Sequence, residues 1–280
     1  MNGIMIQGTC SDAGKSFLVT GLCRLLSDMG IRVCPFKSQN MSNISCAVGD
    51  GLEMSLAQAI QAEAARLRPE TFMNPILLKP MRDTSSEIVL NGRALSERAE
   101  GYGYRDFTQG RGLEAMRRAL KHIEANFDAV IIEGAGSPAE INLNDMEIVN
   151  MRVAREADVP VILAADVDRG GSLASVVGTL ELLGADRERV KGLIFNKFRG
   201  DIKLFEPAVR WTEDYTGVKV IGVMPWLDGA GIPAEDSLSL GKTGATSSNI
   251  TLPEREKAYD KIAASIKEHL DVDAIMNLLR

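Results

Sequence analysis

Six short apolar runs recur along the chain and are separated by longer segments with helical periodicity. The runs are continuous rather than alternating, as is typical of strands buried on both faces of a sheet. They cover residues 3–8, 31–37, 128–136, 159–167, 190–198 and 218–226. Helical patterns lie between several of them, at residues 14–28, 52–67, 112–126, 146–156, 171–184 and 201–215. The alternation predicts an α/β fold, with a mostly parallel sheet and helices on both faces.

Two segments depart from this rhythm. Residues 69–110 contain short extended pieces, which we interpret as an insertion that forms a substrate-facing flap rather than an idle excursion at the sheet edge. Residues 228–253 are dominated by Gly, Ser, Thr and Pro, which is typical of a linker. The segment 254–280 again has apolar residues at helical spacing. We therefore expect a main domain over residues 1–227, a linker over 228–253 and a helical tail over 254–280.

Composition narrows the class of protein. The 280 residues are 45% hydrophobic and 25% charged, and the net charge is −6 with no block of Lys or Arg. This balance argues against a nucleic-acid partner or an anionic membrane surface. No stretch of about 18 apolar residues predicts a membrane span, and the N-terminus has no signal-peptide pattern. The four cysteines have no C-x-x-C spacing, so we expect a cytoplasmic protein with reduced thiols and no zinc site.

The stretch "GTCSDAGKS" at residues 8–16 resembles a phosphate-binding P-loop, G-x-x-x-x-G-K-[ST]. It follows a strand and leads into a helix, whose N-terminus attracts anions. The first glycine stands one place early, and Cys10 is most simply a loop residue. A glycine-rich turn without a ligand is the alternative. The residues predicted to contact a nucleotide here are Gly8, Thr9, Asp12, Ala13, Gly14, Lys15, Ser16 and Phe17.

Polar side chains end several other predicted strands. Glu133 ends one strand, where the acidic partner of a P-loop is expected; a capping carboxylate is the alternative. Lys37 ends another and could bridge a phosphate and a substrate carboxylate, or simply be solvated. Asn196 and Lys197 suggest contact with a nucleotide base, against an ordinary polar strand end. Glu53 opens a predicted helix, where a glutamate is commonly only a dipole partner.

Seven motifs along the chain form a recognisable set. They are "GTCSDAGKS", "PFKSQNMSN", "LEMSLAQAIQAEAA", "MNPILLKP", "VIIEGAGSPAEINLNDMEIVNMRVA", "ADVDRGG" and "IFNKFRGD". Taken together, they resemble the synthetase domain of the cobyric acid synthase family, which is close in fold to dethiobiotin synthetase. The resemblance covers about residues 3–240, and the runs at 131–154 and "FNKFRGD" are its most specific parts. Phosphate loops of this family are similar to "GT", four variable residues and "GK[ST]", so Thr9 is normal there.

The resemblance implies ATP-dependent amidation of peripheral carboxylates on a corrinoid, adenosylcobyrinic acid a,c-diamide, through acyl phosphates to give cobyric acid. It implies ATP and Mg²⁺ as cofactors. Lys15 would bind the phosphates, Lys37 would stabilise the transferred phosphoryl group, and Asn196 would lie near the adenine. The implied Mg²⁺ ligands are Ser16, Glu53 and Glu133.

Candidates for holding the corrinoid come from their positions alone. Asp145, in the "NLND" stretch, is also predicted to be a catalytic residue. The others follow Lys37 along the chain and are Ser38, Gln39, Asn40 and Asn43.

The nitrogen source is the point at which the chain departs from the full-length family, which resembles a fusion of a synthetase and a glutaminase. A class I glutaminase needs a nucleophilic cysteine with a downstream His and Glu. All four cysteines precede residue 47, and the only histidines are His122 and His269. We therefore expect free ammonia or a separate glutaminase as partner. Whether the chain forms a homodimer is left open.

Two other functions remain as alternatives. A dethiobiotin synthetase-like ligase shares the loop, the lysine and the carboxylates, but its small substrate would leave the 69–110 insertion without a purpose. A ParA-type regulatory ATPase typically carries an additional lysine early in the loop, and this loop does not.

Overall fold

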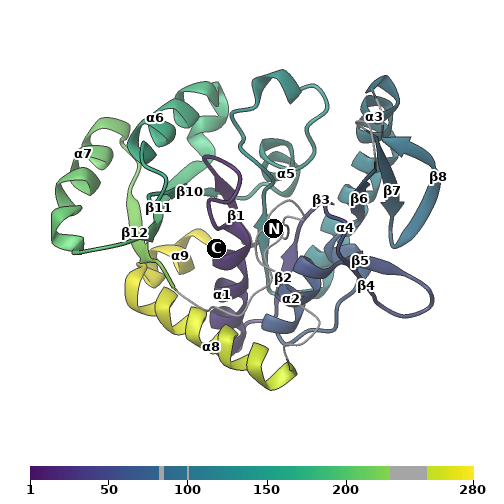
Figure 1. Cartoon of the computed structure of the whole chain (residues 1–280), viewed down its shortest axis with the longest axis horizontal. Helices are drawn as coiled ribbons and strands as arrows, with labels where there is room; N and C mark the ends of the chain where they lie inside the picture. The colour runs from purple at the N-terminus through teal and green to yellow at the C-terminus, as the bar shows by residue number, and fades with distance from the viewer. Residues whose placement is uncertain (82–84, 100, 228–250) are drawn as a thin grey trace.

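The computed structural model describes residues 1–81, 85–99, 101–227 and 251–280. Its centre is a six-stranded sheet in the order β12-β11-β10-β1-β9-β2 (Figure 1). Every neighbouring pair of these strands is parallel, which confirms the predicted α/β class. The strands are β1 (Gly3–Gly8), β2 (Val33–Phe36), β9 (Ala129–Glu133), β10 (Val161–Asp166), β11 (Val190–Phe198) and β12 (Val220–Pro225).

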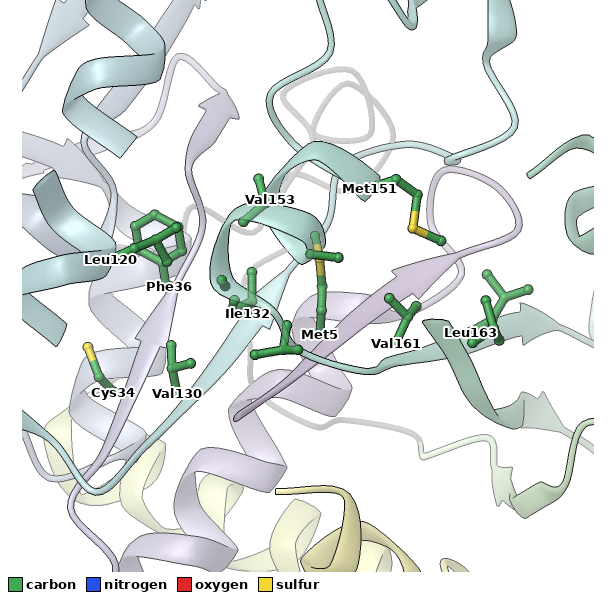
Figure 2. Close-up of a cluster of buried hydrophobic side chains, with 14 of the residues drawn as sticks. Met5, Cys34, Phe36, Leu120, Val130, Ile132, Met151, Val153, Val161 and Leu163 are labelled. Carbon is green, nitrogen blue, oxygen red and sulfur yellow. The ribbon is translucent and has the colours of Figure 1, made fainter. Parts of the chain in front are cut away.

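Two hydrophobic clusters cover the two faces of the sheet, because successive strand residues point to opposite sides. On β1, Met5 belongs to one cluster and Ile4 and Ile6 to the other. Figure 2 shows part of the Met5 cluster, where residues of β1, β2, β9 and β10 meet side chains of α4 and α5. The helices contributing to this face are α2 (Leu56–Ala64), α4 (Leu113–Asn126), α5 (Met151–Ala157), α6 (Ser172–Leu182) and α7 (Glu206–Thr216).

The opposite face is covered by α1 (Lys15–Asp28) and by the two C-terminal helices, α8 (Leu252–His269) and α9 (Val272–Leu278). Helix α8 lies alongside α1 (Figure 1). The predicted helical tail is therefore part of the main hydrophobic core. Its first helix begins at Leu252 behind a Thr251–Glu254 capping box, so the last two residues of the expected linker are helical. Residues 228–250 of that linker lie outside the described residues.

The insertion at 69–110 contributes to a second sheet, in the order β3-β6-β7-β8. The pairing of β3 with β6 is parallel, and the other two pairings are antiparallel. Helix α3 (Gly101–Phe107) packs against β8. The strands of this sheet are β3 (Gln39–Met41), β6 (Ile76–Pro80), β7 (Ser86–Leu90) and β8 (Arg93–Ala99).

Three predicted helices begin later than the sequence pattern suggested. Helix α7 begins at Glu206 instead of residue 201, behind a 3₁₀ turn at Ile202–Leu204. A small hairpin, β4 (Ser45–Ala47) with β5 (Glu53–Ser55), occupies the start of the expected 52–67 helix. Glu53 therefore lies in a strand and not in a first helical turn. Helix α5 begins at Met151 instead of residue 146, because the Glu147 carboxylate accepts backbone N–H groups of Val149, Asn150 and Arg152. Hydrogen bonds from backbone N–H groups to a side chain compete with helical hydrogen bonds, so the helix begins only after them.

Candidate active site

The P-loop connects the end of β1 to the start of α1. Gly14 caps the helix with φ of 89°, and a Cβ there would lie 2.0 Å from Asn196 Nδ2. A Cβ on Gly8 would lie 2.9 Å from the Cys10 carbonyl oxygen and 3.1 Å from Lys15 Nζ. Both positions therefore require glycine, one for its backbone conformation and both for space. The glycine that stands one place early in the motif is the one that lets the loop and Lys15 close over the strand end.

The remaining loop residues tie the P-loop to neighbouring elements. Thr9 donates its backbone N–H to the Ala164 carbonyl at 2.9 Å, and its hydroxyl lies 3.3 Å from that of Ser175 on α6. Ala13 is fully buried, and Phe17 packs against the α1 side of the core. These contacts anchor the loop and leave its backbone N–H groups at the start of α1, where an anion binds best.

Lys15 spans the site from the P-loop to the loop after β9. Its side chain is only 6% exposed, and Nζ donates to the Gly136 carbonyl at 3.1 Å and the Cys10 carbonyl at 3.4 Å. Both of these acceptors are neutral carbonyl groups. A phosphate oxygen is a stronger, charged acceptor. The arrangement therefore suits an anionic ligand at the N-terminus of α1.

Glu133 forms the centre of a buried polar cluster. It is fully buried at the end of β9, and its Oε1 accepts from Ser16 Oγ at 2.9 Å and Lys37 Nζ at 2.7 Å. Its Oε2 accepts from the Gln61 side-chain amide of α2. Burial raises the pKa of the nearby Cys23 thiol, and the negative field of Glu133 raises it further. The order of β2, β9 and β1 in the sheet brings these groups together, as their predicted place at strand ends indicated.

Ser16 and Glu133 fit the requirements of Mg²⁺. The cation prefers oxygen ligands and commonly keeps several waters, so that one or two protein oxygens suffice. A hydroxyl and a carboxylate 2.9 Å apart at the start of a P-loop helix provide that donor set.

Glu53 is already engaged with other side chains. Its carboxylate accepts from Lys79 Nζ at 2.6 and 2.7 Å and from Ser45 Oγ at 2.6 Å. Partial burial would raise its pKa, but the hydrogen bonds from Lys79 and Ser45 outweigh burial and lower it. The carboxylate therefore ties the β4–β5 hairpin to β6, and its role as a Mg²⁺ ligand stays a prediction.

The polar residues after Lys37 are mostly committed to internal contacts. Ser38 is buried and donates to the Ile148 carbonyl, and the Gln39 amide bonds the Tyr104 hydroxyl at 2.7 Å. These bonds fasten β3 and the chain before it to α3 and to the loop before α5. Ser38 and Gln39 thus shape this side of the site, and their predicted contact with a corrinoid remains untested.

Asn40 and Asn43 have opposite surroundings. The buried Asn40 amide donates to Ser55 Oγ at 2.6 Å and Gln58 Oε1 at 2.9 Å. Asn43 is exposed. Only Asn43 of this pair presents a side chain to solvent, and its role as a substrate contact stays a prediction.

Asp145 lies on the exposed loop between β9 and α5. Its carboxylate pairs with Arg105 at 3.4 Å, and its backbone carbonyl accepts from Gln109. The loop carrying Asp145 is therefore linked to the α3 end of the second sheet. Asp145 lies at the surface. Its part in catalysis stays a prediction, and it requires a bound substrate that extends to this loop.

The other side of the P-loop is held by residues at the carboxyl ends of β10 and β11. The buried Asn196 donates its amide to the Ala13 carbonyl at 2.9 Å. Lys197, with φ of 61°, donates to the Asp12 carbonyl and pairs with Asp166 at 2.9 Å. Asn196 and Lys197 thus touch the loop itself, and base recognition remains a prediction for both.

Three site residues escaped the sequence analysis. Arg169 pairs with Asp12 at 2.7 Å, and this hydrogen bond raises the pKa of Arg169. Asn150 bonds both the N–H and the carbonyl of Ala135 and so fixes the loop after Glu133. Arg169 lies in the quoted run "ADVDRGG" and Asn150 in "EIVNMRVA", so a signal was present. Gln61 lies in the quoted run "LEMSLAQAIQAEAA", but the helical pattern there does not show which way its side chain points.

Comparison with known proteins agrees with this geometry. The model of the CobQ/CobB/MinD/ParA nucleotide binding domain (CbiA) matches residues 4–238. The cobyric acid synthase of Anoxybacillus flavithermus is 52% identical over 240 residues, which are 85% of this chain and 47% of that protein. The cobyric acid synthase of Vibrio vulnificus is 45% identical over 273 residues, 97% of this chain and 55% of that protein. The chain thus spans about half the length of the curated relatives it matches.

Among solved structures, the MinD cell division protein of Aquifex aeolicus superposes with a TM-score of 0.47 at 14% identity, covering 96% of this chain and 98% of that one. No helix within the described ranges is both long and apolar enough to cross a membrane.

The family match over residues 4–238 covers the P-loop, the β9 carboxylate and the strand ends that hold the loop. The chain therefore belongs to the CobQ/CobB/MinD/ParA nucleotide-binding domain family and is similar to cobyric acid synthases over most of its length.

Proposed function

We propose that this chain binds ATP with Mg²⁺ and activates peripheral carboxylates of a corrinoid as acyl phosphates, which ammonia converts to amides. The substrate would be adenosylcobyrinic acid a,c-diamide and the product cobyric acid. The observation that carries the proposal is the pair of buried lysines, Lys15 and Lys37, beside Ser16 and Glu133 at the start of α1. The similarity to cobyric acid synthases supports the same activity.

The proposed reaction has two balanced steps. A carboxylate oxygen of the substrate attacks the γ-phosphorus of ATP, the bond to the β-phosphate oxygen breaks, and ADP leaves. Ammonia then attacks the acyl carbon, phosphate leaves with the original carboxylate oxygen, and a proton is lost to give the amide. Such transfer depends on positioning and on neutralising charge on the phosphoryl oxygens. Neither step needs a nucleophile from the protein.

The residues of the chain would contribute to this chemistry in four ways. Lys15 and the N–H groups at the start of α1 would bind the outer phosphates. Lys37, which directly follows β2 beside β9, would stabilise the phosphoryl group as it moves between two oxygens. Ser16 and Glu133 would hold Mg²⁺, which neutralises phosphate charge when bound. Asn196 and Lys197 would lie toward the base, next to the loop backbone that they already contact.

The second sheet supports a large substrate over a small one. It adds β6, β7, β8 and α3 to one side of the nucleotide domain, a set of elements that a small substrate would not require. Asp145, Asn43 and the neighbours Ser38, Gln39 and Asn40 are proposed to form or support the corrinoid side of the site. Ammonia would come from solution or from a separate glutaminase.

The test is amide formation by the purified chain with ATP, Mg²⁺, adenosylcobyrinic acid a,c-diamide and an ammonium salt. Mass spectrometry should show stepwise loss of about 1 Da per amidation, matched by one ADP. Lys15→Met should abolish turnover, whereas Lys191→Met, at an exposed lysine of β11, should not. Turnover with diaminopelargonic acid but not with the corrinoid would instead support a dethiobiotin synthetase-like ligase. Product only with an added glutaminase would identify a protein partner as nitrogen source.

A further inference from the structure

We propose that Gln61 is a positioning residue for Glu133, and that its side-chain amide fixes the orientation in which the carboxylate serves Mg²⁺ and Lys37. This inference rests on the proposed function insofar as it assigns Glu133 to a metal-dependent site. Gln61 lies on α2 and is fully buried. It reaches Glu133 from a different element than Ser16 or Lys37 does.

Ser16, Lys37 and Gln61 together contact both oxygens of the carboxylate. Ser16 and Lys37 donate to Oε1 at 2.9 and 2.7 Å, and Gln61 donates to Oε2. A carboxylate held at one oxygen can rotate about its last bond, whereas one held at both oxygens by groups from separate elements cannot. The amide of Gln61 therefore sets the rotation of Glu133 and with it the direction of Oε1 toward Ser16.

The carbonyl oxygen of the Gln61 amide indicates that the contact with Glu133 does more than fill space. Gln61 Oε1 is buried without a hydrogen-bond partner among the described residues. A buried carbonyl without a partner lowers stability, and such groups in native proteins call for an explanation. An ionised carboxylate only accepts, so the NH₂ group must face Glu133 and the carbonyl must face elsewhere. The donor to Glu133 is thus retained at the expense of an unsatisfied oxygen.

A neutral donor has a particular advantage at this position. Lys37 and Glu133 already offset each other's charge. A third charged group would change the local balance, and a second carboxylate would raise the pKa of the first. An amide orients Glu133 without altering the charge.

The experiment measures ATP binding by calorimetry at increasing Mg²⁺ and without metal, together with thermal unfolding, in the parent and in Gln61→Met. Loss of an orienting partner typically weakens metal affinity by about 10–100-fold. We expect Gln61→Met to need about tenfold more Mg²⁺ for half-maximal enhancement of ATP binding. Metal-free ATP binding should not change. The unfolding midpoint should move by no more than about 4 °C, since the unsatisfied carbonyl is removed along with the bond.

Two further variants make the result specific. Gln58→Met removes an equally buried amide one turn earlier on α2, which bonds Asn40 rather than Glu133, and should leave the Mg²⁺ dependence unchanged. Gln61→Asn keeps the amide but shortens its reach, and should behave as Gln61→Met if that variant does not fold.

An unchanged Mg²⁺ dependence in the folded Gln61 variants would overturn the inference. So would an equal loss of ATP affinity with and without metal, or the same change in Gln58→Met. None of these measurements uses a corrinoid. A parent protein that binds Mg²⁺ and ATP normally while it fails to amidate the corrinoid would therefore count against the proposed function alone.

Discussion

At the scale of single residues, Lys37 and Glu133 form a buried ion pair beside the P-loop. Their side chains are 4% and 0% exposed, and the charged atoms lie 2.7 Å apart. Removing both charges from water is costly, and their attraction and extra hydrogen bonds offset that cost only while both partners are present. The stability of the fold is therefore sensitive to the loss of either charged side chain. A site that handles phosphate charge benefits from a cation already held in place.

We expect Lys37→Met to lower the free energy of unfolding by about 3–5 kcal/mol, because it leaves the Glu133 carboxylate buried without its cation. Urea unfolding followed by circular dichroism measures the change. Adding Glu133→Gln should restore most of the loss. The matched control is Lys79→Met, whose partly exposed pair with Glu53 should contribute about 1 kcal/mol or less. Equal losses in the two lysine variants would contradict the buried-pair interpretation.

Sequence patterns identified Lys37, Ser16 and Glu133 because each ends or begins an element at one edge of a parallel sheet. Gln61 could not be identified in this way. A polar residue in a helix can face solvent or a neighbouring strand, and only the packing of α2 against the sheet decides between them. Asn40 was predicted to face a substrate, but its amide bonds Ser55 and Gln58. The composition of a loop shows which side chains can donate or accept hydrogen bonds. The tertiary structure decides which groups become their partners.

At the scale of elements, Glu53 joins the β4–β5 hairpin to the second sheet through Lys79. Its pKa in the folded protein lies below its ordinary value of 4.5. A carboxyl group with a lowered pKa stabilises the fold at pH values above its unfolded pKa. That stabilisation is lost as the pH falls through the folded pKa.

The parent should therefore be more stable than Glu53→Gln at pH 7, and the difference should shrink as the pH falls below about 4.5. Denaturant unfolding at a series of pH values between 3 and 7, on both proteins in the same buffers, measures the difference. The prediction is wrong if the two stability curves stay parallel down to the lowest pH.

The packing of α8 on α1 is equally open to test. A Cβ on Gly21 of α1 would lie 2.5 Å from both Ile262 Cγ2 and Ile266 Cδ1 of α8. Gly21→Ala should destabilise the protein by about 1–3 kcal/mol, because overpacking outweighs the gain in helix propensity. Gly178→Ala on α6 has open space at the same kind of position and should stabilise by about 0.5–1 kcal/mol. If both variants gain stability in thermal unfolding, α8 does not pack on α1 as described.

Periodicity located the six strands of the main sheet and most of its helices, because buried parallel strands and amphipathic helices have distinct repeats. It failed where side chains govern the backbone, as at Glu147, whose carboxylate delays the start of α5. It also could not predict the second sheet. The parallel pairing of Gln39–Met41 with β6 joins short segments that are far apart in the sequence, and no local pattern specifies such a partner.

At the scale of the whole molecule, a net charge of −6 coexists with a site built to hold anions. The local cations Lys15 and Lys37 and the N-terminus of α1 must therefore attract the nucleotide against the overall field. Helices α8 and α9 belong to the same hydrophobic cluster as α1 and β1. The P-loop helix α1 therefore packs between the central sheet and the C-terminal helices. The fold in this way gives a rigid support to the proposed phosphoryl-transfer site, with the second sheet on the side proposed for the substrate.

The central claim is that a corrinoid carboxylate is activated by direct transfer of the γ-phosphoryl group. The most direct measurement uses a corrinoid labelled with ¹⁸O in its carboxylates, together with ATP, Mg²⁺ and ammonium, and determines the isotope content of the released phosphate by mass spectrometry. The proposed function predicts one ¹⁸O in phosphate for each amide formed. Amide formation with unlabelled phosphate, or ATP hydrolysis that is independent of the corrinoid, would contradict it.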